Sequence, residues 1–212
     1  MKGLIGKKIG MTQVYDEGGK VIPVTIVQAG PCVVMDVKTI EKNGYSAVQL
    51  GFGERKAKNA TMALLGTAKK AGITGNPPAS LREIRTAADP QLELGAIVTA
   101  DIFKADDYLD ISGITKGRGF QGCVRRHGFK GGRYSHGGGW KRKPGSVGMR
   151  ESPGRVFVGK KLPGHMGSVN RTIQNLKIVR VAKEDNLLFI KGAVPGPNGG
   201  TLLIKAALKK SK

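Results

Sequence analysis

The sequence is poor in acidic residues, aromatic residues and cysteine. Fifteen Asp and Glu stand against thirty-six Lys and Arg among 212 residues, which gives a formal net charge of +21 at pH 7. Aromatic residues make up only 5% of the chain, so we expect a core built mainly from Val, Ile, Leu and Ala. The two cysteines, Cys32 and Cys123, are far apart in sequence. This spacing excludes a disulfide framework and fits a reducing compartment.

Long hydrophobic runs are also missing from the sequence. No run approaches the roughly 20 apolar residues that a helix needs to cross a bilayer. The first residues, MKGLIGKKIGMTQ, lack the apolar stretch that is typical of a signal peptide. We therefore expect a cytoplasmic protein with no membrane contact.

The positive charge is concentrated in residues 116–171, which are called the basic arm from here on. This segment holds fourteen Lys and Arg against one acid, Glu151, whereas the other 156 residues hold twenty-two basic and fourteen acidic residues. It also holds fifteen of the thirty-three glycines and all three histidines. Such a charge attracts polyanions, and neutralising phosphates releases counterions. The composition therefore predicts RNA binding, and the alternative is a freestanding RNA chaperone or a nonspecific nucleic-acid-binding protein.

The basic arm has no pattern from which a core is normally built. Between residues 122 and 167 apolar residues are few and show no sustained period of two or 3.6. The many glycines raise the entropic cost of ordering the chain. The sequence therefore predicts an arm that is disordered by itself and becomes ordered against a phosphate backbone.

The rest of the chain is predicted to be mainly β. Short apolar or alternating runs separated by turn residues are typical of a small barrel. Pro23 indicates an edge strand, and hairpins are expected through the turns 42–44 and 184–186. The predicted strands are residues 21–28, 32–40, 45–52, 96–103, 176–181, 187–191 and 201–207.

One segment has helical periodicity instead. Small apolar residues recur at three- and four-residue spacing from Ala57 to Ala71, and Gly72 is suited to end a helix. We expect an insertion into the barrel at about residues 55–94. The predicted domains are residues 1–115, the first part of the barrel with this insertion; 116–171, the basic arm; and 172–212, the last barrel strands with a basic tail.

Three catalytic or cofactor-binding interpretations are rejected. Gly117–Gly122 fits the GxGxxG fingerprint, but the acid that a dinucleotide site needs about 20 residues later is missing, since the next acid is Glu151. The spacing of Cys123 and the three histidines matches no common zinc site. No nucleophile, base and orienting acid can be assembled in the arm. We expect no enzymatic activity, no metal and no cofactor.

The cations and one aromatic residue of the arm are the candidate RNA-binding residues. Arginine makes bidentate contacts with phosphate, which lysine does not. Trp140, flanked by three glycines and three cations, is predicted to stack on a base. A lysine-rich tail ending at Lys212 is expected to bind polyphosphate nonspecifically. The predicted site comprises Lys116, Arg118, Arg125, Arg126, His127, Lys130, Arg133, His136, Trp140, Lys141, Arg142, Lys143, Arg150, Arg155, Lys160, Lys161, His165 and Arg171.

A series of short motifs runs along the whole chain. The first is Gly3–Thr12, and the second is a spaced set of small, hydroxyl and basic residues from Phe103 to Arg126. Others lie at residues 144–148, 152–157, 159–161, 164–167 and 191–196. In this order the motifs resemble the ribosomal L-three family, and so many ordered matches are far more specific than any single motif.

The resemblance implies a translation-protein-type β-barrel with a small α/β insertion and a long basic, glycine-rich loop. It also implies a structural constituent of the large ribosomal subunit that binds ribosomal RNA early in assembly, near its 3′ domain. The loop would reach toward the peptidyl-transferase centre with residues 144–157 at its far end. The implied neighbours are the ribosomal proteins L-fourteen and L-nineteen. Several bacterial relatives carry a methylated glutamine where this chain has Met149, so that modification is not expected here.

Overall fold

The structure, a computed structural model, describes residues 2–210 of the chain. It divides into two compact units. The first unit comprises the chain up to Ile114 and from Asn170 onward, and the second unit comprises Thr115–Val169. The second unit therefore contains all of the basic arm except its last two residues, and each unit is described by itself below.

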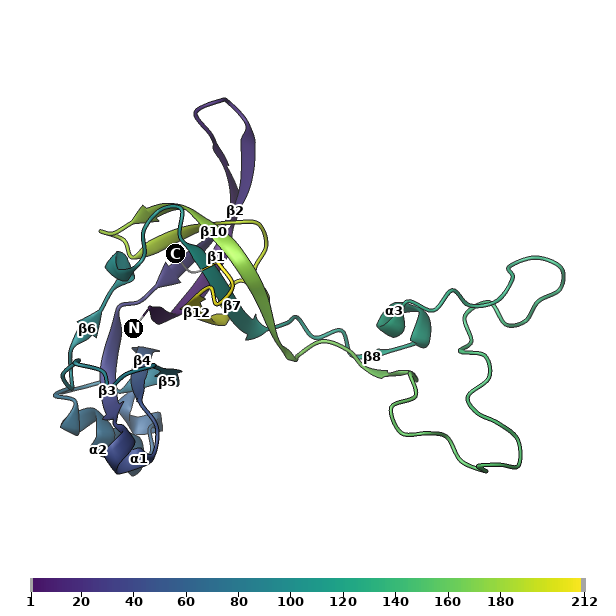
Figure 1. Cartoon of the computed structure of the whole chain (residues 1–212), viewed down its shortest axis with the longest axis horizontal. Coiled ribbons are helices and arrows are strands. Elements are labelled where there is room, and N and C mark those ends of the chain that lie inside the picture. The colour runs from purple at the N-terminus through teal and green to yellow at the C-terminus, as the bar shows by residue number, and fades with distance from the viewer. Residues whose placement is uncertain (1, 211–212) are drawn as a thin grey trace. The chain divides into compact units, whose positions relative to one another are not determined.

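Six strands close into a barrel in the first unit (Figure 1). Each strand pairs antiparallel with its two neighbours, so the closed barrel leaves no unpaired sheet edge along its wall. The predicted mainly-β barrel is confirmed. The order around the barrel is β1 (Gly3–Tyr15), β12 (Thr201–Ala206), β7 (Tyr108–Ile114), β10 (Asn170–Ala182), β11 (Leu187–Lys191) and β2 (Val21–Ala29).

Branched aliphatic side chains fill the barrel. Ile204 pairs with Leu4 on one side and with Ile111 on the other, and all three side chains are fully buried. Burying one such side chain contributes about 1.5–3 kcal/mol. Phe103 is the one aromatic residue among the buried hydrophobic residues of the described chain. The predicted core of aliphatic side chains is confirmed.

A second, four-stranded sheet follows β2 in the first unit. Its strand order is β5-β4-β3-β6, and two short α-helices and a 3₁₀ turn lie in its connections. The insertion predicted at residues 55–94 is therefore too narrow, because the strands outside the barrel begin at Cys32. Alternation identifies a strand but not the sheet in which it pairs. The elements are β3 (Cys32–Lys38), α1 (Ile40–Asn43), β4 (Ala47–Glu54), η1 (Ala57–Asn59), α2 (Met62–Lys70), β5 (Pro78–Arg85) and β6 (Ile97–Val98), with η2 (Ala100–Ile102) after them.

One local prediction is confirmed and two need correction. From Val24 onward β2 is an interior strand of the barrel, but Pro23 lies beyond the end of the β2–β11 pairing and pairs only with Gln13 of β1, so the predicted edge is confirmed at this residue. The strand predicted at 96–103 is confined to β6, since η2 follows it directly. Helix α2 begins only at Met62, where the Thr61 hydroxyl accepts a hydrogen bond from the backbone N–H of Leu64.

Strand β1 was not predicted at all, because glycine and lysine are poor strand formers. Gly6 shows why this strand nevertheless contains glycine. A Cβ atom at Gly6 would lie 2.6 Å from the carbonyl oxygen of Gln28 on β2. The close approach of β1 and β2 in the barrel thus requires a residue without a side chain.

The second unit contains little regular structure. A two-stranded ladder pairs β8 (Phe120–Gln121) with β9 (Gly164–His165), and α3 (Cys123–His127) follows β8. Figure 1 draws the remainder of this unit as loop. Near α3 and β9 the buried side chain of Cys123 supplies a small packed site, and the disorder of the free arm stays a prediction.

Candidate nucleic-acid interface

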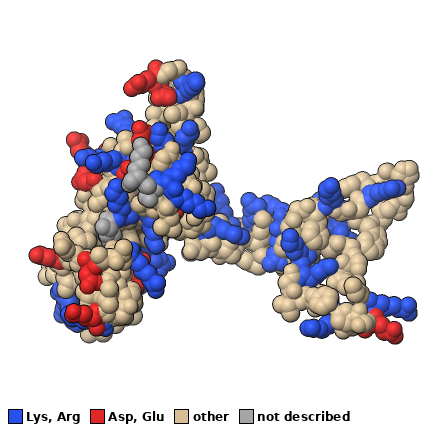
Figure 2. Space-filling model, in the orientation of Figure 1, with Lys and Arg blue, Asp and Glu red and all other residues tan. Residues whose placement is uncertain are grey.

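The second unit is almost exclusively positive. Residues 115–169 contain thirteen Lys and Arg and one acid, Glu151. In Figure 2 blue side chains are spread over this unit, with one small red area. Acidic residues of the first unit, by contrast, lie beside lysines in ion pairs, such as Lys38 with Glu83 at 2.6 Å and Lys177 with Asp106 at 2.8 Å. The cations of the second unit take part in none of the ion pairs found within residues 2–210, so their charge is available to an anionic partner.

Sixteen of the eighteen predicted RNA-binding residues are exposed to solvent. None of the four ion pairs found within residues 2–210 involves any of the eighteen. Exposed guanidinium and ammonium groups without an acidic neighbour bind phosphate at the smallest electrostatic cost, because no internal ion pair must be broken first. The side chains are therefore placed to contact a polyanion.

Arg126 and His127 are the two exceptions, and both are half-buried. The Arg126 guanidinium donates to the carbonyl oxygen of Leu162 at 2.7 Å, and His127 Nε2 lies 3.0 Å from the same oxygen. A Cβ atom on Gly164 would lie 2.6 Å from Arg126 Nη1. These side chains thus tie α3 to the chain near β9, and we call this arrangement the arm clasp. The two ends of the clasp are 36 residues apart, so no local sequence pattern predicts it.

Arg171 lies outside the second unit. It is on β10 of the barrel, opposite Gly113 of β7, and its side chain is exposed. The predicted RNA-binding residues therefore do not all belong to the second unit.

Trp140 is 57% exposed, as expected for an aromatic residue that is not part of a core. Its carbonyl oxygen accepts hydrogen bonds from the backbone N–H groups of Gly132, at 3.3 Å, and Lys143, at 3.2 Å. Trp140 lines a cavity of about 360 Å³ together with Phe129, Lys130 and Lys143, among others. An exposed ring that lines the same cavity as two lysines suits a nucleobase and its flanking phosphates.

Several exposed apolar side chains of this unit were missed. Phe120, Tyr134, Phe157 and Val158 are 76%, 63%, 54% and 97% exposed. Their signal in the sequence was available, since an aromatic residue in a segment that has no core must lie at the surface. Like Trp140, these side chains can contact bases or sugars between the cations.

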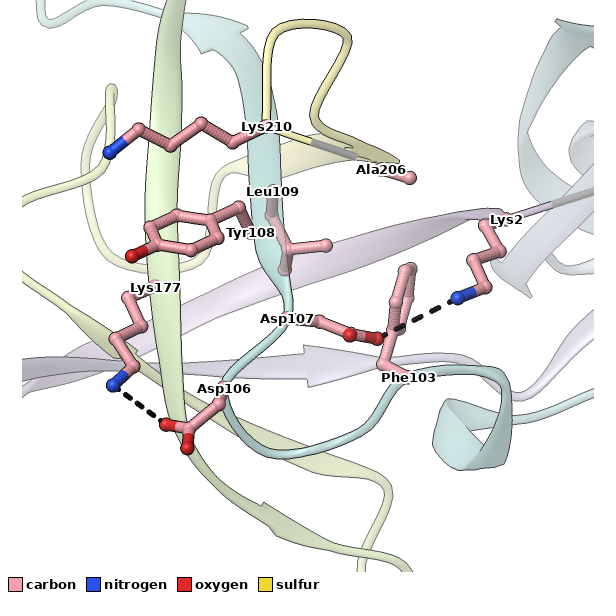
Figure 3. Close-up of a pocket in the computed structure, with 9 residues that line it drawn as sticks. All are labelled: Lys2, Phe103, Asp106, Asp107, Tyr108, Leu109, Lys177, Ala206 and Lys210. Carbon is pink, nitrogen blue, oxygen red and sulfur yellow. Dashed lines mark ion pairs between the residues drawn. The ribbon is translucent and has the colours of Figure 1, made fainter. Parts of the chain in front are cut away.

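A pocket of about 370 Å³ at the barrel provides a useful contrast (Figure 3). Its cations already have partners. Lys177 lies 2.8 Å from Asp106, which raises the pKa of Lys177, and Lys2 lies 3.9 Å from Asp107. Lys210 Nζ lies 4.8 Å from the centre of the Tyr108 ring. This pocket therefore offers less uncompensated charge than the second unit.

Three further features of the described residues concern metal binding, thiol reactivity and membrane-spanning helices. Within residues 2–210, no group of three or more His, Cys, Asp or Glu side chains is placed to hold a metal ion. Cys32 is buried, and that burial raises the pKa of its thiol to about 11. In the same range, no helix has the length and apolar character to cross a membrane.

A closed barrel combined with a separate unit of exposed, unpaired cations defines a basic structural protein suited to a polyanionic partner. Comparison with known proteins makes the class specific. The family model described as Ribosomal protein L3 matches residues 55–187. The chain belongs to this family, whose members are structural proteins and not enzymes.

Three relatives, each described as large ribosomal subunit protein uL3, match nearly the whole chain. The protein from Alkaliphilus metalliredigens is 49% identical over 212 residues, which is 100% of both chains. The proteins from Pelotomaculum thermopropionicum and Heliobacterium modesticaldum are 48% and 49% identical over 208 residues, which is 98% of each chain. The resemblance inferred from the short motifs is confirmed.

Proposed function

We propose that this protein is a structural constituent of the large ribosomal subunit, located in the cytoplasm, and that its basic arm binds ribosomal RNA early in assembly. The observation that carries the proposal is the set of exposed cations of the arm that make no ion pair. The family supports the same assignment, because the three relatives are named as proteins of the large ribosomal subunit.

The chemistry of the arm favours a folded RNA over a soluble anion. The part of the arm that lies in the second unit contains seven arginines, including the half-buried Arg126. Arginine makes two parallel hydrogen bonds with one phosphate. Exposed rings such as Trp140 and Phe120 occur among these cations in the sequence, and stacking of a base on such a ring contributes about 1–3 kcal/mol.

The resemblance to the family supports a more detailed placement within the subunit. Residues 144–157 would approach the peptidyl-transferase centre, and the neighbouring proteins would be the ribosomal proteins L-fourteen and L-nineteen. Met149 is 74% exposed, and Arg150 and Glu151 beside it are also exposed. Because Arg150 and Glu151 are adjacent and carry opposite charges, the tip suits a role in shaping RNA without supplying a catalytic group to peptide transfer.

Cosedimentation tests the proposal directly. Labelled protein is incubated with ribosomal components under assembly conditions and centrifuged through a sucrose gradient at high salt. The proposal predicts that the label migrates with large subunits at a fixed stoichiometry. A freestanding RNA chaperone would instead distribute over many RNAs and dissociate as salt rises, and that result would contradict the proposal.

The tip is tested by single-turnover peptide transfer on reconstituted ribosomes. We expect Arg150→Ala to change tRNA accommodation or drug sensitivity modestly and to leave the chemical step intact. Met149→Gln, which restores the residue of several bacterial relatives, is the matched variant. Loss of the chemical step in the Arg150→Ala ribosome, with subunits normally assembled and tRNA bound, would contradict a purely structural tip.

A further inference from the structure

Strands β1 and β2 continue beyond the barrel wall as a hairpin (Figure 1). The pairing of β1 with β12 ends at Lys7 opposite Thr201, and the pairing of β2 with β11 ends at Val24 opposite Lys191. From Ile9 to Tyr15, β1 has ladder pairs only with β2 among the described residues. The outer part of this hairpin is therefore not covered by the barrel.

One face of the hairpin is apolar and open to solvent. The register places Tyr15 opposite Val21, Gln13 opposite Pro23 and Met11 opposite Thr25, and Thr25 is already buried, so the open part of this face lies outward of Thr25. Paired residues and every second residue share one face of a sheet. Met11, Tyr15 and Val21 are 53%, 63% and 53% exposed. These three residues with Gln13 and Pro23 are called the hairpin face.

The backbone of β1 beside this face is also open. The Asp16 N–H donates to the Lys20 carbonyl oxygen at 3.0 Å, which fixes the alternation of hydrogen-bonded pairs along the hairpin. By that alternation the N–H and C=O groups of Met11, Gln13 and Tyr15 point away from β2. Ile9–Tyr15 contains no charged residue and no proline. Proteins normally protect such an edge with charges, proline or a covering segment.

The hairpin differs from the rest of the chain in charge. Residues 9–26 contain Asp16, Glu17 and Lys20 and no other charged residue, which gives a net charge of −1 in a chain of +21. Figure 2 shows red and blue atoms only at the tip of this hairpin, with uncharged residues below. A phosphate backbone finds almost no cation here. An exposed apolar face with acidic residues at its end suits a cationic protein surface.

We propose that the hairpin face is the docking surface for a basic protein of the same particle, a segment of which packs on Met11, Tyr15 and Val21 with its cations beside Asp16 and Glu17. The inference rests on the proposed function, because it needs a particle in which other basic proteins lie close by. RNA is disfavoured by the charge of the hairpin. A second copy is disfavoured because two chains of +21 repel each other.

Two tyrosines make a matched pair of probes. Tyr15 on the hairpin face and Tyr134 in the second unit are both 63% exposed, but they lie in segments of opposite charge. Each is replaced in turn by the photoreactive p-benzoylphenylalanine, and the full-length chain is assembled into large subunits. After irradiation, nuclease and protease treatments distinguish crosslinks to RNA from crosslinks to protein, and mass spectrometry identifies the crosslinked peptide.

We expect the probe at Tyr15 to crosslink to one protein through a Lys- or Arg-rich peptide, and the probe at Tyr134 to crosslink to RNA. The double change Asp16→Lys with Glu17→Lys should lower the yield at Tyr15 at least several-fold and leave the yield at Tyr134 unchanged. The inference would be overturned if the probe at Tyr15 crosslinked to RNA or to a second copy of this chain, or gave no crosslink. It would also be overturned if the probe crosslinked to a protein with a yield that the double charge reversal did not lower. If the unsubstituted chain fails to enter subunits, the proposed function itself fails.

Discussion

The barrel and the second unit differ in where their apolar and charged side chains find contacts. In the barrel, Ile111 and Ile204 are buried on paired strands, and all four ion pairs found within residues 2–210 lie in the first unit. In the second unit, rings such as Trp140 and nearly all the cations face solvent. The barrel is therefore stabilised by its own contacts, whereas most of the second unit must obtain its contacts from a partner.

The largest difference between the two units should appear in a pair of alanine substitutions. Ile111→Ala removes a fully buried side chain, which should lower the free energy of unfolding by about 2–5 kcal/mol. Val158→Ala removes a side chain that is 97% exposed and should leave that free energy unchanged within error. Urea denaturation followed by circular dichroism measures both. Equal losses in the two variants would contradict the contrast.

Limited proteolysis sharpens the boundary inside the second unit. Trypsin should first cut the free protein after exposed cations between Lys130 and Lys160, because few backbone hydrogen bonds hold that segment. Arg125 and Arg126 should be cut later, since they lie in α3. Mass spectrometry of the first fragments measures the order. Cleavage in α3 or in the second sheet at the same rate would show that this boundary is misplaced.

The arm clasp is tested by Gly164→Ala. The new Cβ atom would displace the Arg126 guanidinium from the Leu162 carbonyl, and losing such a hydrogen bond typically costs about 1–3 kcal/mol. The effect should be local. Labelling of the buried Cys123 thiol should become faster while the melting temperature of the barrel stays the same. Gly139→Ala is the matched control, because a Cβ atom there meets nothing within 4 Å; equal labelling rates in both variants would contradict the clasp.

The smallest effect is expected at the ion pair of the second sheet. Lys38, and secondly the Tyr45 hydroxyl, hydrogen-bond Glu83 and hold the pKa of its carboxyl below the ordinary value of 4.5. A lowered folded-state pKa contributes stability above the unfolded value, and this contribution is lost as pH falls below about 4.5. Glu83→Gln should therefore lower stability slightly at pH 7 and bring no further loss near pH 3. Thermal melts at both pH values measure this, and an unchanged acid dependence would exclude Glu83 as a contributor.

Strands with clear alternation of apolar and polar residues could be predicted from the sequence. Other strands could not, because contacts with residues distant in sequence determine their burial. Residues 187–191 and 201–207 were found as β11 and β12. β7 was not among the predicted strands, and it contains Asp110, a residue type that is usually exposed. Asp110 is in fact buried, where its carboxylate accepts hydrogen bonds from the backbone N–H groups of Asn175 and Leu208. Those partners lie 65 and 98 residues away, so no local pattern reveals them.

The candidate site was predictable in its composition but not in its internal contacts. A segment with many cations and one acid can be recognised from the sequence without knowledge of the fold. In the structure, sixteen of the eighteen predicted side chains are exposed. That Arg126 and His127 bond the Leu162 carbonyl depends on a chain reversal of which the sequence gives no sign. The hairpin face was missed for a similar reason, because the register that puts Met11, Tyr15 and Val21 together follows from the pairing of β1 with β2.

The salt dependence of binding to large-subunit ribosomal RNA tests most directly whether the second unit is the RNA-binding surface. In one variant Arg133, Lys141, Arg142 and Lys143 are changed to Gln, and in the matched variant the exposed Lys56, Lys58, Lys69 and Lys70 of the second-sheet region are changed instead. Each lost phosphate contact reduces the slope of log K against log salt by about 0.7–0.9. The slope should become shallower by about 3 in the first variant and stay unchanged in the second. Equal slopes in both variants, or a loss confined to the second, would contradict the account.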